Sequence, residues 1–296
     1  MPSLKDVKKK IASVEKTEQI TKAMNMVASA KLRRAQERIE KFRPYADKYY
    51  EMLKDLSKGV DTSVHPLLEP REEIKSTGIV IVTSERGLCG AFNTNLTNTA
   101  GALAKEKMAE GKQVKFLAVG RKAVQAARKV EGAEVINSYV GVMDSYDFTL
   151  ANKIGLEIIN AFEDRVVDEV FLIYGEFISI LRQEPKTLQL LPVVHPGDEG
   201  EEGKEQEGAK ALYMYEPSVE GLLSELLPRF VKVQVYRGML DTSASEHAAR
   251  MTAMDNASKN CVEMIHKLTL AYNKARQAAI TAELLDIVGG AEALKG

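Results

Sequence analysis

One stretch decides the fold: Leu32–Leu56, LRRAQERIEKFRPYADKYYEMLKDL, in which an apolar or small side chain recurs at every third or fourth position. The recurring residues are Leu32, Ala35, Ile39, Phe42, Ala46, Tyr49, Leu53 and Leu56. Alternating steps of three and four place them along one narrow side of an α-helix, which is the pattern of a two-helix coiled coil. Pro44 lies inside the run and is expected to bend or locally loosen the helix.

The same spacing begins close to the first residue of the chain. The early seam residues are Leu4, Val7, Ile11 and Val14. Ile20, Met24 and Val27 do not keep the phase of the parts on either side, so we interpret them as a slip similar to a coiled-coil stutter. With Ser3 as N-cap and Gly59 as stop, the predicted helix is roughly 80 Å long.

A second long helix is predicted at the other end of the chain. Its seam residues are Leu240, Ala244, His247, Met251, Met254, Ser258, Cys261, Ile265, Leu268, Tyr272, Ala275, Ala279 and Ala282. The helical pattern starts at Ser218, includes Pro228 as a predicted kink and ends before Gly289, so residues 218–288 would extend roughly 105 Å. Helices of globular proteins usually contain roughly 8–20 residues, so neither long helix is an ordinary core element.

Between the two helices the pattern changes to alternating strands and helices, which predicts a Rossmann-like α/β domain with a mostly parallel sheet. We predict strands at 79–82, 114–119, 135–140, 169–174 and 187–193, and helices at 93–109 (capped by Asn93), 121–129 and 148–162. Residues 197–208 are acidic and glycine-rich, which is typical of a flexible surface loop.

The predicted fold class is therefore α+β overall: a long antiparallel two-helix coiled coil plus a central α/β domain. The predicted parts are a coiled-coil helix at 1–58, the α/β domain at 75–194, the flexible loop at 195–211, and a short strand with the second helix at 212–296. If Leu56 lies near Ser218, then Leu4 lies near Leu270, and the second helix overhangs the first by about 15 to 20 residues, or about 25 Å. We expect a compact domain that carries a long stalk.

Composition and charge narrow the functional classes. Apolar residues make up 45% and charged residues 28%, no run approaches the ~18 apolar residues of a membrane span, and the first residues lack a targeting signal, so we expect a cytosolic chain. Residues 1–43 carry twelve Lys/Arg against five Asp/Glu. This basic segment is either a solvated helix face or a surface for an acidic partner. Nucleic acid is disfavoured, because aromatic residues are absent before Phe42 and no binding module is recognisable.

We find no pattern of residues that predicts catalysis, a cofactor or a metal. Phosphate-loop and dinucleotide motifs are absent, the four histidines lack metal-ligand spacing, and Cys89 has no activating partner nearby in sequence. The nearest candidate is Ser84–Asn93, SERGLCGAFN, which follows a strand and opens a helix, where α/β folds bind phosphate groups. It supports a rival hypothesis, a ligand-binding α/β module with a coiled-coil dimerisation arm. A coiled-coil scaffold with a purely structural role is a second rival.

Four motifs resemble those of the gamma subunits of bacterial F-type ATP synthases. They are ITKAMNMVASAKL at 20–32, SERGLCGAFN at 84–93, SEHAARM at 245–251, and the run from Tyr272 through Thr281 and Glu283 to Ala291. The resemblance covers essentially the whole chain in the right order. The family usually has Asp where Glu85 stands and commonly Asn where Gly175 stands, and this sequence lacks the insertion with paired regulatory cysteines of chloroplast relatives.

The resemblance implies a non-catalytic central rotor shaft. Its paired helices would rise inside a ring of three alpha and three beta subunits, while the α/β domain would meet the epsilon subunit and the membrane c-ring. Ion flow would drive ATP synthesis, reversibly, at the cytoplasmic face of the bacterial inner membrane, with the shaft as a peripheral component that does not insert into the membrane.

The resemblance and the helix pattern together select contact residues. For the rotor–stator boundary they are Lys8, Lys9, Lys22, Met24, Arg33, Arg34, Arg250, Arg276, Gln277, Thr281 and Glu283. We expect Met24 to be a flexible apolar contact near Arg250, although packing in the seam is the alternative. Beyond Glu283, the apolar residues Leu284, Leu285, Ile287 and Val288 would run in an apolar sleeve at the top of the ring. Tyr213, Tyr215 and Glu216 are the residues expected to touch the membrane ring.

Overall fold

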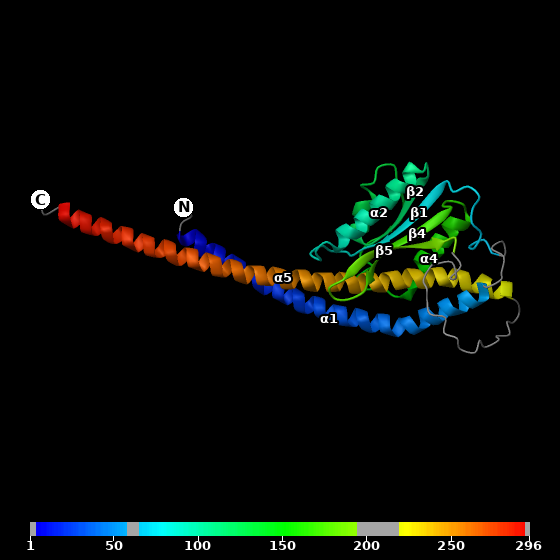
Figure 1. Cartoon of the computed structure of the whole chain (residues 1–296), viewed down its shortest axis with the longest axis horizontal. Coiled ribbons are helices and arrows are strands. Elements are labelled where there is room, and N and C mark those ends of the chain that lie inside the picture. The colour runs from blue at the N-terminus through cyan, green and yellow to red at the C-terminus, as the bar shows by residue number, and fades with distance from the viewer. Residues whose placement is uncertain (1–3, 58–64, 194–218, 294–296) are drawn as a thin grey trace. The chain divides into compact units, whose positions relative to one another are not determined.

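The structure is a computed structural model that describes residues 4–57, 65–193 and 219–293. Its elements are α1 (Leu4–Ser57), β1 (Ser76–Val82), α2 (Phe92–Ala109), β2 (Gln113–Val119), α3 (Arg121–Ala127), β3 (Glu134–Tyr139), α4 (Phe148–Glu163), β4 (Glu169–Phe177), β5 (Gln183–Leu191) and α5 (Val219–Ala293), as Figure 1 shows. The chain divides into two compact units. We call residues 1–29 with 250–296 the helix-pair unit, and residues 30–249 the sheet unit.

The sheet confirms the predicted α/β class. Its strand order is β3-β2-β1-β4-β5, with the first four strands parallel and β5 antiparallel to β4. The fifth strand begins at Gln183, four residues earlier than the sequence pattern predicts, and includes Pro185. A proline is tolerated there because β5 is an edge strand, so its outer side needs no ladder hydrogen bonds.

Helices cover both faces of this sheet. On β1, Ile79 and Ile81 point into a cluster with residues of α2 and α3, while Val80 and Val82 point into a cluster with residues of α4, α5 and α1. Alternate side chains of a strand face opposite sides, so an uninterrupted apolar run is what a strand covered on both faces requires. The paired helices therefore supply part of the core of the sheet unit.

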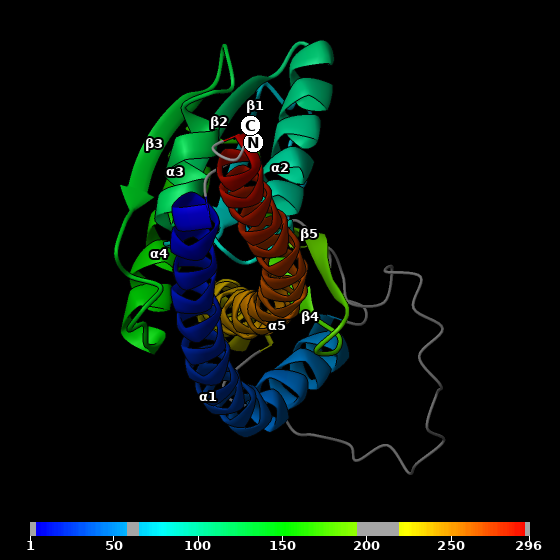
Figure 2. The same ribbon diagram turned by 90° about the vertical axis from the view of Figure 1, so that its left-hand side faces the viewer.

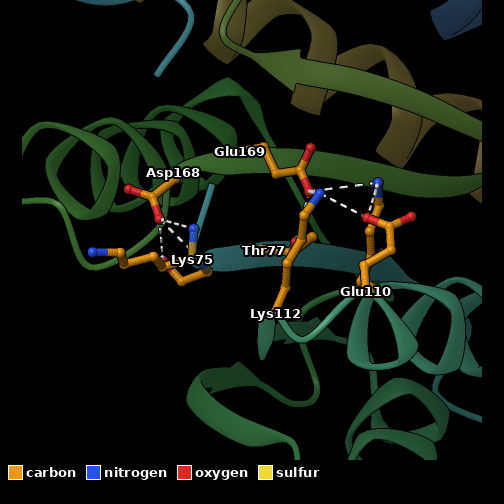
Figure 3. A network of polar contacts seen from close by, with 8 residues as sticks. Lys75, Thr77, Glu110, Lys112, Asp168 and Glu169 are labelled. Atoms are coloured by element: carbon orange, nitrogen blue, oxygen red, sulfur yellow. Dashed lines mark hydrogen bonds and ion pairs between the residues drawn. The ribbon is translucent and has the colours of Figure 1, made fainter. Parts of the chain in front are cut away.

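A polar network closes the edge of the sheet where β1 and β4 begin (Figure 3). The buried Glu169 carboxylate accepts a hydrogen bond from the Thr77 hydroxyl at 2.7 Å and lies 3.1 Å from the Lys112 ammonium. Next to it, Asp168 accepts hydrogen bonds from the backbone N–H groups of Lys75 and Ser76. Burial alone would raise the pKa of Asp168, but these hydrogen bonds hold it below its usual range. The network fixes the start of both strands.

Helix α5 approaches β4 closely within the sheet unit. A Cβ added to Gly238 would lie 3.1 Å from Leu172 and 3.4 Å from Tyr174, so the absence of a side chain lets the helix backbone reach the sheet. One turn later, the Thr242 hydroxyl accepts a hydrogen bond from the Gly175 N–H, and the Ser245 hydroxyl donates one to the Gly175 carbonyl. Packing and directional bonds together fix α5 to the central strands.

The seam of α1 is confirmed, but the predicted slip is wrong. Leu32, Ala35, Ala46, Tyr49, Leu53 and Leu56 are buried, and Ile39 and Phe42 are half-buried. Earlier in the helix, the buried positions are Val7, Thr21 and Ala28, with Asn25 half-buried, whereas Ile20 and Val27 are 59% and 58% exposed. The three-four spacing therefore continues without interruption through polar and small residues, which a search for apolar residues passes over.

Within each unit, the partner helix α5 runs antiparallel to α1, as predicted, and the two helices can be followed in Figures 1 and 2. Asn25 donates a hydrogen bond to the Met251 carbonyl at 2.8 Å in the helix-pair unit. In the sheet unit, Tyr49 donates one to the Leu226 carbonyl at 3.1 Å. As residue numbers rise along α1 they fall along α5, which confirms the expected orientation.

Both long helices continue through residues that were expected to disturb or end them. Pro44 lies inside α1 and Pro228 inside α5, and α5 runs past Gly289 and Gly290 to Ala293. The prediction that α5 ends before Gly289 is therefore wrong. A helical glycine costs about 1 kcal/mol relative to alanine but does not prevent the helical conformation. The proposed N-cap Ser3 and stop Gly59 lie outside the described residues.

Candidate interaction surface

The predicted basic contact residues of α1 all lie on its surface. Lys8, Lys9, Lys22, Arg33 and Arg34 are exposed. The Arg33 side chain, 84% exposed, forms an ion pair with Glu37 at 3.4 Å on the same helix. Exposed pairs of this kind contribute roughly 0–1 kcal/mol, so they leave the arginine available to a partner.

Met24 and Arg250 fall in the same part of the helix-pair unit, as the antiparallel register predicted. Both residues are half-buried, and the hydrogen bond from Asn25 to the Met251 carbonyl joins their immediate neighbours. Met24 does not stand in the seam, because Thr21, Asn25 and Ala28 hold that phase. It belongs instead to the stripe of α1 next to the seam, in phase with Ile20, and this position leaves part of its side chain open to a partner.

Asn25 is a contact that an apolar pattern cannot reveal. Its amide is a polar group in a seam, and it donates to a backbone carbonyl of the partner helix at 2.8 Å. A polar residue at a single core position of a coiled coil fixes the register of its two helices at some cost in stability. Asn25 therefore acts as a register marker for α1 and α5.

Among the residues that the structure describes, the far end of α5 is exposed to solvent. Seam residues of α5 are half-buried as far as Ala275, and every residue from Arg276 to Ala291 is exposed. This confirms the predicted overhang. The predicted contacts Arg276, Gln277, Thr281 and Glu283 all lie on it, and the Thr281 hydroxyl donates to the Gln277 carbonyl of the same helix.

This overhang also exposes large apolar side chains. They are Ile280 (50% exposed), Leu284 (57%), Leu285 (66%), Ile287 (62%) and Val288 (63%). Exposed apolar groups gathered on one segment mark an interaction surface more often than isolated ones do. The expected ring contacts Tyr213, Tyr215 and Glu216 lie outside the described residues.

The Ser84–Asn93 loop uses its polar groups within the sheet unit. The Asn93 side chain accepts hydrogen bonds from the Ser84 N–H and hydroxyl and donates to the Arg86 carbonyl. Asn93 is not the helix N-cap that the sequence predicted, because α2 begins at Phe92 with Ala91 at the cap position. Its side chain instead closes the loop.

Glu85 ties this loop to two other segments. Its carboxylate is buried and accepts hydrogen bonds from the backbone N–H groups of Arg121 at 3.1 Å and Met143 at 3.3 Å. A loop whose side chains form hydrogen bonds with its own backbone and with neighbouring segments has a structural role. This arrangement disfavours the ligand-binding rival.

Metal-ligating side chains do not gather in the described part of the chain. In residues 4–57, 65–193 and 219–293, no three His, Cys, Asp or Glu side chains lie where they could together hold a metal ion. Over the same ranges, no helix combines the length and the apolar character needed to cross a bilayer.

Asp241 is an unusual group that the sequence pattern did not reveal. It lies on α5 beside a small cavity that α1 and β4 also line, and it is buried. Burial raises the pKa of Asp241 to about 6, and Glu176 adds to the rise, while Arg237, Arg43 and Lys186 oppose it. The nearest cation is the Arg237 guanidinium at 4.0 Å. That separation is too long for a close ion pair.

These surfaces define the class of protein. It is a subunit whose long paired helices present contact surfaces to partner proteins, and whose α/β domain shares its core with both helices. Comparison with known proteins identifies the family. A family profile described as "ATP synthase" matches residues 3–294. The ATP synthase gamma chain of Maridesulfovibrio salexigens is 63% identical over the full length of both chains, and that of Nitratidesulfovibrio vulgaris (strain Miyazaki F) is 62% identical, also over the full length of both.

Comparison with solved structures finds the same fold in ATP synthases. A chain of the Euglena gracilis mitochondrial ATP synthase (OSCP/F1/c-ring, rotational state 3) has the same fold with a TM-score of 0.71, 24% identity, and coverage of 98% of this chain and 94% of that one. A chain of the Tetrahymena thermophila mitochondrial ATP synthase central stalk/c-ring gives a TM-score of 0.59 at 26% identity, covering 81% and 99%. The chain belongs to the ATP synthase gamma-chain family. It is thus a subunit of the ATP synthase complex.

Proposed function

We propose that this chain is the non-catalytic shaft that couples ion flow through the membrane ring to conformational change in the catalytic subunits. The observation that carries the proposal is the overhang of α5, a single helix exposed from Arg276 to Ala291 with apolar side chains on it. A rotating shaft needs a long element with little directional bonding at its tip, and an apolar helix in an apolar sleeve meets that need because hydrophobic contact is non-directional.

The partners would divide along the helices. Three alpha and three beta subunits would surround the helix-pair unit, with Arg276, Gln277, Thr281 and Glu283 contacting a catalytic subunit. The exposed lysines and arginines of α1, together with Arg250, would face acidic surface on the beta subunits. Weak exposed ion pairs suit such a contact, because each must form and break as the shaft turns.

The remaining contacts would fall on the middle part of the chain. The predicted α/β domain, 75–194, would meet the epsilon subunit, and Tyr213, Tyr215 and Glu216 would touch the membrane ring. The 1–58 and 212–296 segments would form the shaft and 195–211 the surface loop. The complex would stand on the cytoplasmic face of the bacterial inner membrane, with this chain as a peripheral component.

Reconstitution tests the proposal. We expect alpha and beta subunits to co-purify with this chain, and the complete complex in sealed vesicles to pump ions when ATP is supplied. A chain shortened after Ala275 removes the overhang and should lower ATP-driven pumping more than it lowers co-purification. Full pumping by the shortened chain would contradict the role assigned to the overhang. The absence of any assembly with alpha and beta subunits would contradict the proposed function as a whole.

A further inference from the structure

Arg38 is a half-buried arginine of α1. It is not one of the residues proposed to contact the alpha and beta subunits, so its burial needs another explanation. Its guanidinium donates hydrogen bonds to the Tyr146 carbonyl at 2.6 Å and to the Tyr236 hydroxyl at 3.3 Å. The same group lies 4.3 Å from the centre of the Tyr146 ring. Tyr146 belongs to the loop between β3 and α4, and Tyr236 belongs to α5. One side chain of α1 thus binds both the loop between β3 and α4 and the second helix.

The loop that Arg38 binds is itself firmly held. Its Met143 N–H donates to Glu85, whose carboxylate also accepts from the N–H of Arg121 at the start of α3. At the other end of the loop, the Asp147 carboxylate accepts from the Leu150 N–H and caps α4. These bonds connect the loop to the ends of β1, α3 and α4. A force on Arg38 therefore reaches several elements of the sheet unit.

Aromatic rings surround the same point. The Tyr236 ring meets Phe42 of α1 edge-on at 4.8 Å and Phe148 of α4 edge-on at 5.5 Å. Edge-to-face pairs have a preferred geometry, so they resist rotation of one element against another more than aliphatic contacts do. A weaker ion pair, Lys31 with Asp144 at 3.7 Å, joins α1 to the loop two turns earlier.

The two helices are held to the sheet in different ways. Between residues 238 and 245, α5 is bound to β4 by close packing at Gly238 and by the bonds of Thr242 and Ser245 to Gly175. α1 packs on α5 mainly through an apolar seam, and apolar contact alone does not fix rotation or sliding. Directional bonds between α1 and α5 also occur, for example from Tyr49 to the Leu226 carbonyl and from Asn25 to the Met251 carbonyl. The Arg38 bonds add a charged donor, and they reach the loop before α4 as well as α5.

We propose that Arg38 is a positioning residue that clamps α1 to the loop between β3 and α4 and to α5, so that torque enters both helices of the shaft rather than α5 alone. The inference rests on the proposed rotor function and deepens it. Arg38 acts by holding α1 against Tyr146 and Tyr236. Packed elements transmit strain, so a clamp at Arg38 stiffens the two helices where it joins them.

The test uses the assembled complex with Arg38→Met, which keeps the apolar stem and removes every donor. Torsional stiffness is measured from the angular fluctuations of a probe attached to the sheet unit while the alpha and beta subunits are immobilised without ATP. We expect stiffness to fall by up to roughly twofold, because α1 loses its charged, directional bonds to the loop and to α5 while its apolar packing on the sheet remains. Amides of α1 near residue 38 should exchange hydrogen about tenfold faster.

Two further variants separate a clamp from a general loss of folding. Arg38→Lys keeps one charged donor and should recover part of the stiffness. Lys41→Ala changes an exposed residue on the same helix and should match the wild-type chain. If Arg38→Met does not assemble, Arg38→Gln replaces it, with intermediate stiffness expected.

The outcomes distinguish the two proposals. Wild-type stiffness in Arg38→Met, or in Arg38→Gln where that variant is used, would overturn the clamp while leaving the rotor function standing. A wild-type chain that assembles but supports no ATP-driven pumping would overturn the rotor function itself. Lower stiffness in Arg38→Met, partial recovery in Arg38→Lys and no change in Lys41→Ala would support the clamp.

Discussion

Asp241→Asn should make the chain more stable at neutral pH. In the folded chain, burial raises the pKa of Asp241 from 3.8 to about 6. The unfolded chain therefore loses this proton at a lower pH than the folded chain, and stability falls as pH rises from about 4 to about 6. One pKa unit corresponds to about 1.4 kcal/mol, so the ionised carboxylate costs about 3 kcal/mol above that window. Asparagine has a similar shape and no charge to bury.

The assay is denaturant unfolding of the wild-type and variant chains from pH 4 to pH 8, followed by far-UV circular dichroism because the chain contains no tryptophan. We expect Asp241→Asn to raise the free energy of unfolding by about 3 kcal/mol at pH 7.5 and by almost nothing near pH 4. Asp47→Asn is the matched control, since Asp47 lines the same cavity but is exposed. A gain that is independent of pH, or a loss at pH 7.5, would refute the reasoning.

Three further predictions concern packing and coupling. Leu32→Ala should lower the free energy of unfolding by about 2–5 kcal/mol, because Leu32 is buried in the seam. Val27→Ala should change it by less than about 0.5 kcal/mol, because Val27 is exposed. Equal losses in the two variants would favour the slip in the seam that the sequence pattern predicted. Gly175→Ala should cost about 1–3 kcal/mol, since its Cβ would lie 2.5 Å from the Phe92 ring, and an unchanged unfolding midpoint would show that the ring can move. Met24→Lys should impair coupling more than assembly, so unchanged ATP-driven pumping in vesicles would contradict the contact assigned to Met24.

The long helices could be predicted from sequence because only a long α-helix with a continuous contact face repeats a three-four spacing over many turns. The spacing also predicted their orientation and the overhang, since the two lengths are unequal. It failed at Thr21, Asn25 and Ala28, where polar and small residues occupy the seam and the neighbouring apolar residues face outward. A heptad counted by position rather than by hydrophobicity would have found them.

The contacts that hold α1 and α5 to the sheet were beyond sequence reasoning. Gly175 and Gly238 look like weak points in a strand and a helix until the structure shows that each makes room for a close neighbour. Arg38 looks like one more cation on a basic helix. Its function depends on a carbonyl more than one hundred positions away in the sequence, a pairing that no local pattern encodes.

Single-molecule rotation tests the central claim most directly. The alpha and beta subunits are fixed to a surface, this chain is added, and a probe is attached through its sheet unit. On addition of ATP, we predict continuous rotation of the probe in one direction, which stops when the tip of α5 is cross-linked to a beta subunit. ATP hydrolysis with a stationary probe, or unhindered rotation after that cross-link, would contradict a shaft that turns inside the catalytic ring.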